Sequence, residues 1–241
     1  MTHINSISLV IPVFNEEANL PLLHKEITTA LEGLRPRWEV IYINDASKDA
    51  SLAVIRDLAQ RDDHVRYLSF RENRGQSAGF AAGFQHATGE AVVTLDADLQ
   101  NDPADIPAML ALYEAENADM VIGWRTTRKD TATKRLSSRI GNAARNWWTR
   151  ETVHDTGCSL KVMRTEMARR MPVFKNMHRY LPTLMKMQKA TVLEIPVNHR
   201  HRMHGVSKYG TWDRLKAGIY DLIGVRWLLD RAIDYDIEDK K

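Results

Sequence analysis

Short apolar runs alternate with helix-like segments along the first half of the chain. The apolar runs, many of them β-branched, predict buried strands at residues 8–14, 38–43, 65–70, 90–95 and 120–123. Helices are predicted between them at residues 17–34, 51–61 and 75–87 and from Asp102-Pro103 onward, with Asn15 expected to cap the first. Strands separated by helices form parallel βαβ units, so the pattern predicts an α/β fold with a mainly parallel, doubly wound sheet flanked by helices.

The second half of the chain is less regular. Residues 132–150 predict a basic helix, residues 158–163 and 191–199 predict strands with helices between them, and residues 211–231 predict an amphipathic helix. We therefore expect one domain at residues 1–210, followed at residues 211–241 by a C-terminal helix and a polar tail.

The composition is that of a globular protein with a sizeable core, because 44% of the 241 residues are hydrophobic. The single cysteine, Cys158, cannot form an intrachain disulfide, which favours a reducing compartment. The N-terminus lacks the pattern of a signal peptide. The best candidate for a membrane span, residues 219–229, is short and contains Asp221 and Arg226.

The net charge of +3 hides an asymmetry between the two halves. Residues 1–120 contain 9 Lys or Arg and 19 Asp or Glu, whereas residues 121–241 contain 25 and 12. The basic half therefore faces an acidic partner or the acidic half itself. A nucleic acid, an anionic membrane and a phosphate substrate each fit this charge.

The sharpest chemical signal is the run from Asp96 to Pro103, directly after a predicted buried strand. In a doubly wound sheet, ligands bind beyond the carboxyl ends of the strands. Two carboxylates one residue apart at such an end suit Mg²⁺ or Mn²⁺, with open positions for phosphate oxygens. The alternative is a solvated turn in which Asp102 caps a helix.

Three further segments follow the other strands. Asp45 could accept hydrogen bonds from a base or ribose, while Ser47 and Asp49 also suit a helix start. The segment from Pro12 to Glu17 could form a wall for a nucleobase, although helix capping explains it as well. Residues 71–79 contain glycine but match neither phosphate-binding glycine motif, so close helix packing is the favoured role.

Together these strings resemble the GT-A catalytic domain of family 2 glycosyltransferases. The resemblance is greatest to the branch of dolichol-phosphate mannosyltransferases and bacterial polyprenyl-phosphate glycosyltransferases. It covers roughly residues 7–230 and includes Gly123-Trp124-Arg125, Asp155-Thr156-Gly157-Cys158 and the string from Asn198 to Tyr209. Family members often have Tyr at the position of Phe14 and Asp-Asp-Gly-Ser at positions 44–47, which leaves the nucleotide preference open.

The resemblance implies roles for residues at matching positions. Asp98 and Gln100 would ligate Mg²⁺ or Mn²⁺. The phosphate groups of donor or acceptor would contact Arg125, Arg202 and Lys208, which with Asp98 form the expected catalytic set. The nucleotide-sugar would contact Pro12, Phe14, Glu16, Ile43, Asp45, Asp96 and Ala97.

The basic half then suits a polyprenyl phosphate acceptor. Residues 125–150 contain eight Lys or Arg and a single acid, and Arg135, Arg139 and Ser207 are candidates for the acceptor phosphate. An ionised phosphate needs no general base, so we expect direct attack on the sugar with inversion. The alternatives are a soluble transferase with a hydroxyl acceptor, for which Asp155 is the candidate base, and a non-catalytic subunit that binds nucleotide-sugar.

Partners follow from the same reasoning. The spacing of His199, His201 and His204 does not match a zinc site, and no nucleic-acid-binding module is present. Trp147-Trp148 and the apolar side chains of residues 220–228 predict either contact with a membrane surface or core and oligomer packing. We expect a cytoplasmic enzyme peripheral to the cytoplasmic face of the membrane, with a membrane-protein partner or a second copy of the chain as further candidate partners.

Overall fold

The computed structural model describes residues 3–126, 146, 148–149, 152–200 and 211–233, without the side chains of residues 211–217 and 219. Its strands form a seven-stranded sheet in the order β3-β2-β1-β4-β6-β5-β7. β1 pairs in parallel with β2 and β4, and β5 pairs in parallel with β7. The strands are β1 (Ser6–Val13), β2 (Arg37–Asn44), β3 (Val65–Ser69), β4 (Ala91–Thr94), β5 (Met120–Trp124), β6 (Lys161–Arg164) and β7 (Val192–Pro196).

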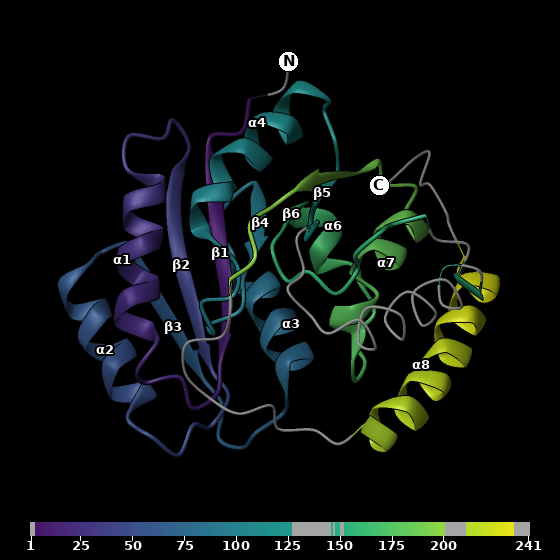
Figure 1. Cartoon of the computed structure of the whole chain (residues 1–241), viewed down its shortest axis with the longest axis horizontal. Coiled ribbons are helices and arrows are strands. Elements are labelled where there is room, and N and C mark those ends of the chain that lie inside the picture. The colour runs from purple at the N-terminus through teal and green to yellow at the C-terminus, as the bar shows by residue number, and fades with distance from the viewer. Residues whose placement is uncertain (1–2, 127–145, 147, 150–151, 201–210, 234–241) are drawn as a thin grey trace, which may run out of the picture.

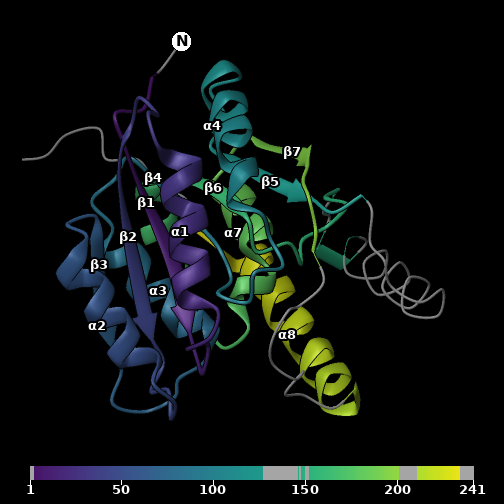
Figure 2. The ribbon, with the colours of Figure 1, turned by 60° about the vertical axis from the view of Figure 1, so that its left-hand side comes forward.

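Helices cover both faces of this sheet (Figures 1 and 2). α1, α2 and α4 bury apolar side chains on one face, and α3, α6, α7 and α8 do so on the other. The helical segments are α1 (Leu20–Leu31), α2 (Ser51–Arg61), α3 (Gln76–His86), the short η1 (Pro103–Asp105), α4 (Ile106–Ala115), α6 (Thr165–Arg169), the short η2 (Met177–Arg179), α7 (Leu181–Met187) and α8 (Thr211–Arg231).

The alternation of side chains along β1 explains how one strand serves both faces. Leu9 and Ile11 pack with the α1 side, whereas Val10 between them packs with the α3 side. Glycines let α3 approach the sheet closely: a Cβ on Gly79 would lie 2.9 Å from Pro12 Cβ. The packing role expected for the small residues of the 71–79 region is therefore confirmed for this helix.

The predicted start of the first helix is wrong. Asn15 does not cap it, because α1 begins at Leu20 with Asn19 at the cap position and Pro21 in the first turn. Asn15 instead has a left-handed backbone with φ of 57°. Its N–H donates to Ser47 Oγ at 3.0 Å, so this segment belongs to the loops beyond the strand ends.

The sheet is mainly parallel, as expected, and contains one antiparallel strand in its second half. β6 runs antiparallel to β4 and β5, so the sheet is mixed, although mainly parallel. A short buried strand has the same apolar pattern in either direction, so sequence could not show this. Most of the predicted basic helix at 132–150 lies outside the described residues. None of the helices in the described part of the chain has the length and hydropathy needed to cross a membrane.

Candidate active site

The chain changes direction across the sheet between β1 and β4. From β1 it continues outward through β2 and β3, and it then returns to pair β4 with the other side of β1. α1 and α2 lie on one face and α3 on the opposite face, so the loops diverge beyond the carboxyl ends of β1 and β4. This switch point is where open α/β sheets bind ligands.

Asp96 and Asp98 follow β4 at this switch point. Gln76 Nε2 donates to Asp96 Oδ1 at 2.5 Å, and the backbone N–H of Gln100 donates to Asp98 Oδ1 at 3.2 Å. Burial, followed by the charge of Asp98, raises the pKa of Asp96 to about 6. The charge of Asp98 therefore disfavours the ionised form of Asp96, and a bound cation would offset this repulsion.

The donor set fits a hard divalent cation. Within the described residues, no group of three or more His, Cys, Asp or Glu side chains could hold a metal ion. The chain would supply the Asp98 carboxylate and the Gln100 amide oxygen, while phosphate oxygens and water completed the coordination. Mg²⁺ commonly binds in this way, through few protein ligands and substrate phosphates.

The loops after β1 and β2 are joined by hydrogen bonds from backbone to side chain. The N–H of Glu16 donates to Ser51 Oγ at 2.9 Å, and the N–H of Lys48 donates to Asn15 Oδ1 at 2.7 Å. Asp49 Oδ2 accepts from the N–H of Glu17 at 3.2 Å. These bonds fix the backbone of the loop that follows Pro12 and Phe14.

Asp45 has a structural partner that its sequence position does not reveal. Its two carboxylate oxygens accept from the N–H groups of Arg74, at 2.6 Å, and Gly75, at 2.8 Å. Asn73 Nδ2 also donates to the Asp45 carbonyl at 3.1 Å. Asp45 thereby fixes the turn that leads into α3, where Gly75 has a φ of 83°.

The segment after β7 crosses back to the same edge of the sheet. The N–H of Arg200 donates to the Gln100 carbonyl at 2.8 Å, and its guanidinium contacts Asp102 at 2.5 Å and both oxygens of Glu26 at 2.8 Å. His199 forms an antiparallel bridge with Asn101. This contact places residues 198–200 beside the turn that carries Asp98 and Gln100.

Arg125 and Asp155 form a bidentate ion pair at the same site. Arg125 Nε donates to Asp155 Oδ2 at 2.6 Å, and an Nη donates to Oδ1 at 2.9 Å. Only 12% and 7% of the two side chains are exposed. Burial opposes the charged guanidinium, but the bonds and charge of Asp155 outweigh it and raise the pKa of Arg125.

A family model described as glycosyl transferase family 2 matches residues 8–171, which is more than half of the chain. The chain belongs to glycosyl transferase family 2. Its relatives include dodecaprenyl-phosphate galacturonate synthase from Rhizobium johnstonii, 36% identical over 227 residues, which cover 92% of this chain and 67% of the relative. Undecaprenyl-phosphate 4-deoxy-4-formamido-L-arabinose transferase from Salmonella choleraesuis is also 36% identical, over 91% of this chain and 67% of its own length.

Solved structures confirm the GT-A fold of this family 2 glycosyltransferase. Glucosyl-3-phosphoglycerate synthase from Mycobacterium tuberculosis matches with a TM-score of 0.69 and 19% identity over 95% of this chain and 81% of that one. A mannosyltransferase from Pyrobaculum calidifontis, solved with GDP-Man and Mn²⁺, matches with a TM-score of 0.61 and 17% identity over 96% and 71%. The synthase was also solved with Mg²⁺ and uridine diphosphate, so proteins of this fold bind divalent cations.

The structure brings together most of the site residues expected for a family 2 glycosyltransferase. Pro12, Phe14, Glu16 and Asp45 lie at the ends of β1 and β2, and Asp96, Ala97, Asp98 and Gln100 follow β4. Ile43 also lies at the end of β2, with its side chain fully buried against α3, and its contact with the nucleotide-sugar stays a prediction. Arg135, Arg139, Arg202, Ser207 and Lys208 lie outside the described residues.

Lys161 is a site residue that sequence analysis missed. It lies in β6 with 2% exposure, and its Nζ donates to the Cys158 carbonyl. Burial lowers the pKa of Lys161, whereas the charges of Cys158, Asp155 and Asp96 oppose that shift. The charges of Lys161 and Asp96 act on each other. A lysine at the start of a short apolar strand gives no motif that could have identified it.

Proposed function

We propose that this chain is a metal-dependent, inverting glycosyltransferase that moves a sugar from a GDP- or UDP-sugar to the phosphate of a polyprenol. The observation that carries this proposal is the mutually repelling pair Asp96 and Asp98 at the switch point, with Arg125 and Lys161 close by. Both relatives named above act on prenyl phosphates according to their names, and their similarity extends over nine-tenths of this chain.

Each part of the site has a separate task in this reaction. The carboxylate of Asp98 and the amide of Gln100 would hold Mg²⁺ or Mn²⁺, which neutralises charge on the diphosphate leaving group. The loops after β1 and β2 fix the nucleoside wall, and Asp45 fixes the turn before α3. The acceptor phosphate is already ionised at neutral pH, so its oxygen attacks the anomeric carbon without a general base.

The Arg125–Asp155 pair favours a phosphate acceptor over a hydroxyl. A hydroxyl acceptor requires a base within reach of its proton. Asp155 was the candidate for that role, but both of its oxygens accept hydrogen bonds from Arg125. The acidic pair also favours catalysis over a binding-only subunit, because neither nucleoside nor sugar binding by itself requires two adjacent, repelling carboxylates.

A lipid acceptor implies contact with a membrane surface, and α8 has a suitable face. Tyr220, Ile223 and Trp227 are 80%, 57% and 63% exposed at helical spacing, whereas Val225 packs inward. Trp148 is also partly exposed and lies beside α8, because Arg226 donates to its carbonyl at 3.1 Å. Exposed aromatic side chains of this kind bind the interfacial region of a bilayer.

The proposal is tested by a transfer assay with purified protein. UDP- and GDP-sugars would be offered with Mn²⁺, with and without a short polyprenyl phosphate, and the anomeric configuration of the product would be determined. Asp98→Ala is expected to lower kcat by at least about a hundredfold, since it removes a ligand of the ion that stabilises the leaving group. Asp57→Asn is the matched control, because Asp57 forms only an exposed ion pair on α2.

The outcomes separate the competing functions. Turnover that needs the metal, Asp98 and the lipid phosphate supports the proposal and identifies the sugar. A product with retained configuration contradicts direct attack, and equal transfer to a sugar hydroxyl without lipid supports a soluble transferase. Tight nucleotide binding without any transfer indicates a non-catalytic subunit or a requirement for a membrane-protein partner.

A further inference from the structure

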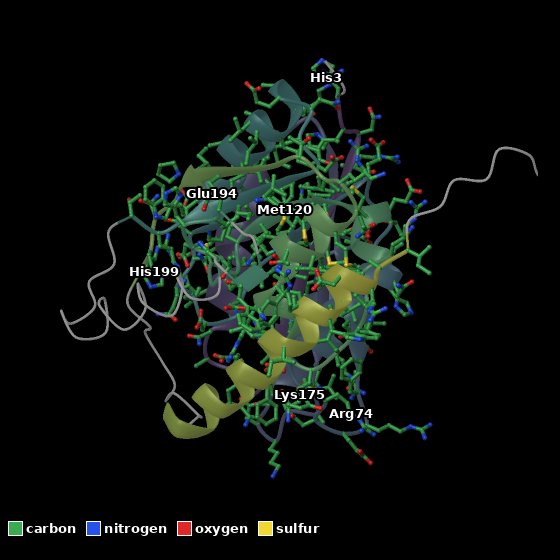
Figure 3. All side chains as sticks on the ribbon, turned by 90° about the vertical axis from the view of Figure 1, so that its right-hand side faces the viewer. His3, Arg74, Met120, Lys175, Glu194 and His199 are labelled. Carbon is green, nitrogen blue, oxygen red and sulfur yellow. The ribbon has the colours of Figure 1, made fainter. Side chains whose placement is uncertain are left out.

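The short helix η2 and the residue before it are hydrogen-bonded to α3 and to α8. It follows Lys175, which lies with Arg74 at the lower end of the molecule in Figure 3, where the loop before α3 also lies. The side chain of Met177 in η2 is buried in the same apolar cluster as Val225 of α8 and Phe80 of α3. η2 therefore shares one buried apolar cluster with both helices.

A hydrogen bond joins η2 to the first turn of α3. Ser77 Oγ and His178 Nδ1 are 2.8 Å apart, although their residues are 101 positions apart in sequence. Ser77 is buried, and it directly follows Gln76, whose amide donates to Asp96 at 2.5 Å. The first turn of α3 thus contacts His178 through Ser77 and Asp96 through Gln76.

His178 keeps the same protonation state over the physiological range. Burial, together with the charges of Arg179 and Lys161, lowers its pKa to about 3. A neutral imidazole has one donor and one acceptor nitrogen, so its bond to the Ser77 hydroxyl persists without any change in charge. Within the described residues, His178 makes no second hydrogen bond.

The residue before η2 is anchored to α8. Asn176, which precedes the helix, has a left-handed backbone with φ of 68°. Its Nδ2 donates to Asp221 Oδ2 on α8 at 2.8 Å. The position of His178 therefore depends on α8, and the helix with the exposed aromatic face is connected to the donor site through described hydrogen bonds.

We propose that His178 is a positioning residue for the donor. Its bond to Ser77 fixes the first turn of α3, and this turn holds Gln76 against Asp96 beside the metal ligand Asp98. The inference rests on the proposed function, because it takes Asp96 and Asp98 to be the binding site for the donor diphosphate. None of the sequence motifs described above includes His178.

The test is a comparison of His178→Leu, His178→Asn, His178→Gln and Ser77→Ala. Calorimetry would measure the binding of UDP and GDP with Mn²⁺, and the transfer assay would give donor KM and kcat. An Asn amide reaches the position of Nδ1, whereas a Gln amide reaches that of Nε2. His178→Leu, His178→Gln and Ser77→Ala are expected to weaken nucleotide binding about tenfold, whereas His178→Asn retains it within about threefold.

The double variant with Ser77→Ala and His178→Leu should be no worse than either single variant, since both remove the same bond. Gln85→Ala is the matched control, because Gln85 ties the far end of α3 to the Arg169 carbonyl at 3.0 Å. It is expected to lower the unfolding temperature without changing nucleotide affinity. If Gln85→Ala weakened nucleotide binding as much as His178→Leu does, His178 would have only a general packing role and the proposal would be overturned.

Wild-type affinity in His178→Leu would also overturn the proposal, as would an Asn variant as defective as the Leu variant. The binding assay needs no acceptor, so it separates the two hypotheses. Normal binding of UDP or GDP without transfer to polyprenyl phosphate contradicts the proposed function and leaves the role of His178 testable by affinity. A wild-type protein that binds neither nucleotide contradicts both.

Discussion

Gly83 of α3 packs directly against Val10 of β1, and no side chain fits between them. A Cβ on Gly83 would overlap Val10 Cγ1 and would lie 3.2 Å from Ile43 Cδ1. Val10 and Ile43 are both fully buried, so neither can move aside cheaply. The closeness of α3 to the sheet thus depends on this glycine, and so does the position of its first turn at the site.

Gly83→Ala is therefore expected to destabilise the protein. Alanine favours helix by about 1 kcal/mol, but overpacking against Val10 costs about 1–3 kcal/mol and should prevail. Gly224→Ala is the matched control, because Gly224 lies in α8 with open space around its Cα. Urea unfolding should show a loss for Gly83→Ala and a gain of about 0.5–1 kcal/mol for Gly224→Ala. A stabilised Gly83→Ala would show that α3 can shift away from the sheet.

Breaking the buried Arg125–Asp155 pair should lower the free energy of unfolding more than breaking an exposed ion pair does. Asp155→Asn leaves a mostly buried guanidinium without a charged partner, and we expect a loss of about 3 kcal/mol in the free energy of unfolding. Asp57→Asn breaks an exposed pair with Arg61 and should cost less than about 1 kcal/mol. Chemical denaturation of both variants beside the wild type measures the difference. Equal losses would contradict a structural role for the Arg125–Asp155 pair.

Sequence predicted the local parts of this molecule better than the long-range ones. Asp96 and Asp98 were identified because the acidic pair and the strand before it are contiguous in the chain. The partners of Asp45 and Arg125 were not identified from the sequence. Gly75 is 30 positions from Asp45, and Asp155 is 30 positions from Arg125. The direction of β6 was not identified either, because it depends on the neighbouring strands in the sheet rather than on the apolar pattern of β6 itself.

Removing the charge of Asp96 should raise the stability of the protein and weaken its binding of nucleotide. The raised pKa of Asp96 shows that its ionised form is disfavoured in the folded protein, by burial first and by Asp98 second. Asp96→Asn removes that charge, so at pH 7 and without metal we expect unfolding to require about 1–2 kcal/mol more. Nucleotide binding with Mn²⁺ should weaken at least about tenfold. A variant that loses both stability and binding would show that the hydrogen bond from Gln76 outweighs the repulsion.

His178 should give the protein a specific acid sensitivity. Its pKa is about 3 in the folded state and near 6.5 when unfolded, so below pH 6.5 the unfolded chain binds a proton that the folded chain does not. Its contribution to stability is complete above pH 6.5 and is lost at about 1.4 kcal/mol per pH unit as pH falls toward 3. Arg179 and Lys161 are the charged groups that, after burial, oppose protonation of His178 in the folded protein.

Unfolding of wild type and His178→Asn at pH 7.5, 6.5, 5.5 and 4.5 measures this effect. Other groups titrate in both proteins, so the difference between the two isolates the histidine. The advantage of the wild type over the variant should shrink at each step below pH 6.5 and reverse as acidification continues. Parallel curves over the whole range would show that His178 is exposed enough to bind a proton in the folded state.

The exposed face of α8 should determine binding to a membrane surface. Tyr220, Ile223 and Trp227 point away from the core while Val225 packs into it, so the face can enter a bilayer interface without disturbing the fold. Trp227→Ser is expected to weaken binding to anionic phospholipid vesicles about tenfold, given about 25 cal/mol for each Å² of apolar surface removed from water. Val173→Ser is the matched control, because Val173 is 64% exposed but lies outside α8.

Transfer to a short, water-soluble prenyl phosphate should be unchanged in Trp227→Ser, while transfer to a long polyprenyl phosphate in vesicles falls with binding. If both variants sediment with vesicles as the wild type does, and the wild type forms dimers that Trp227→Ser does not, the face is an interface between copies of the chain instead.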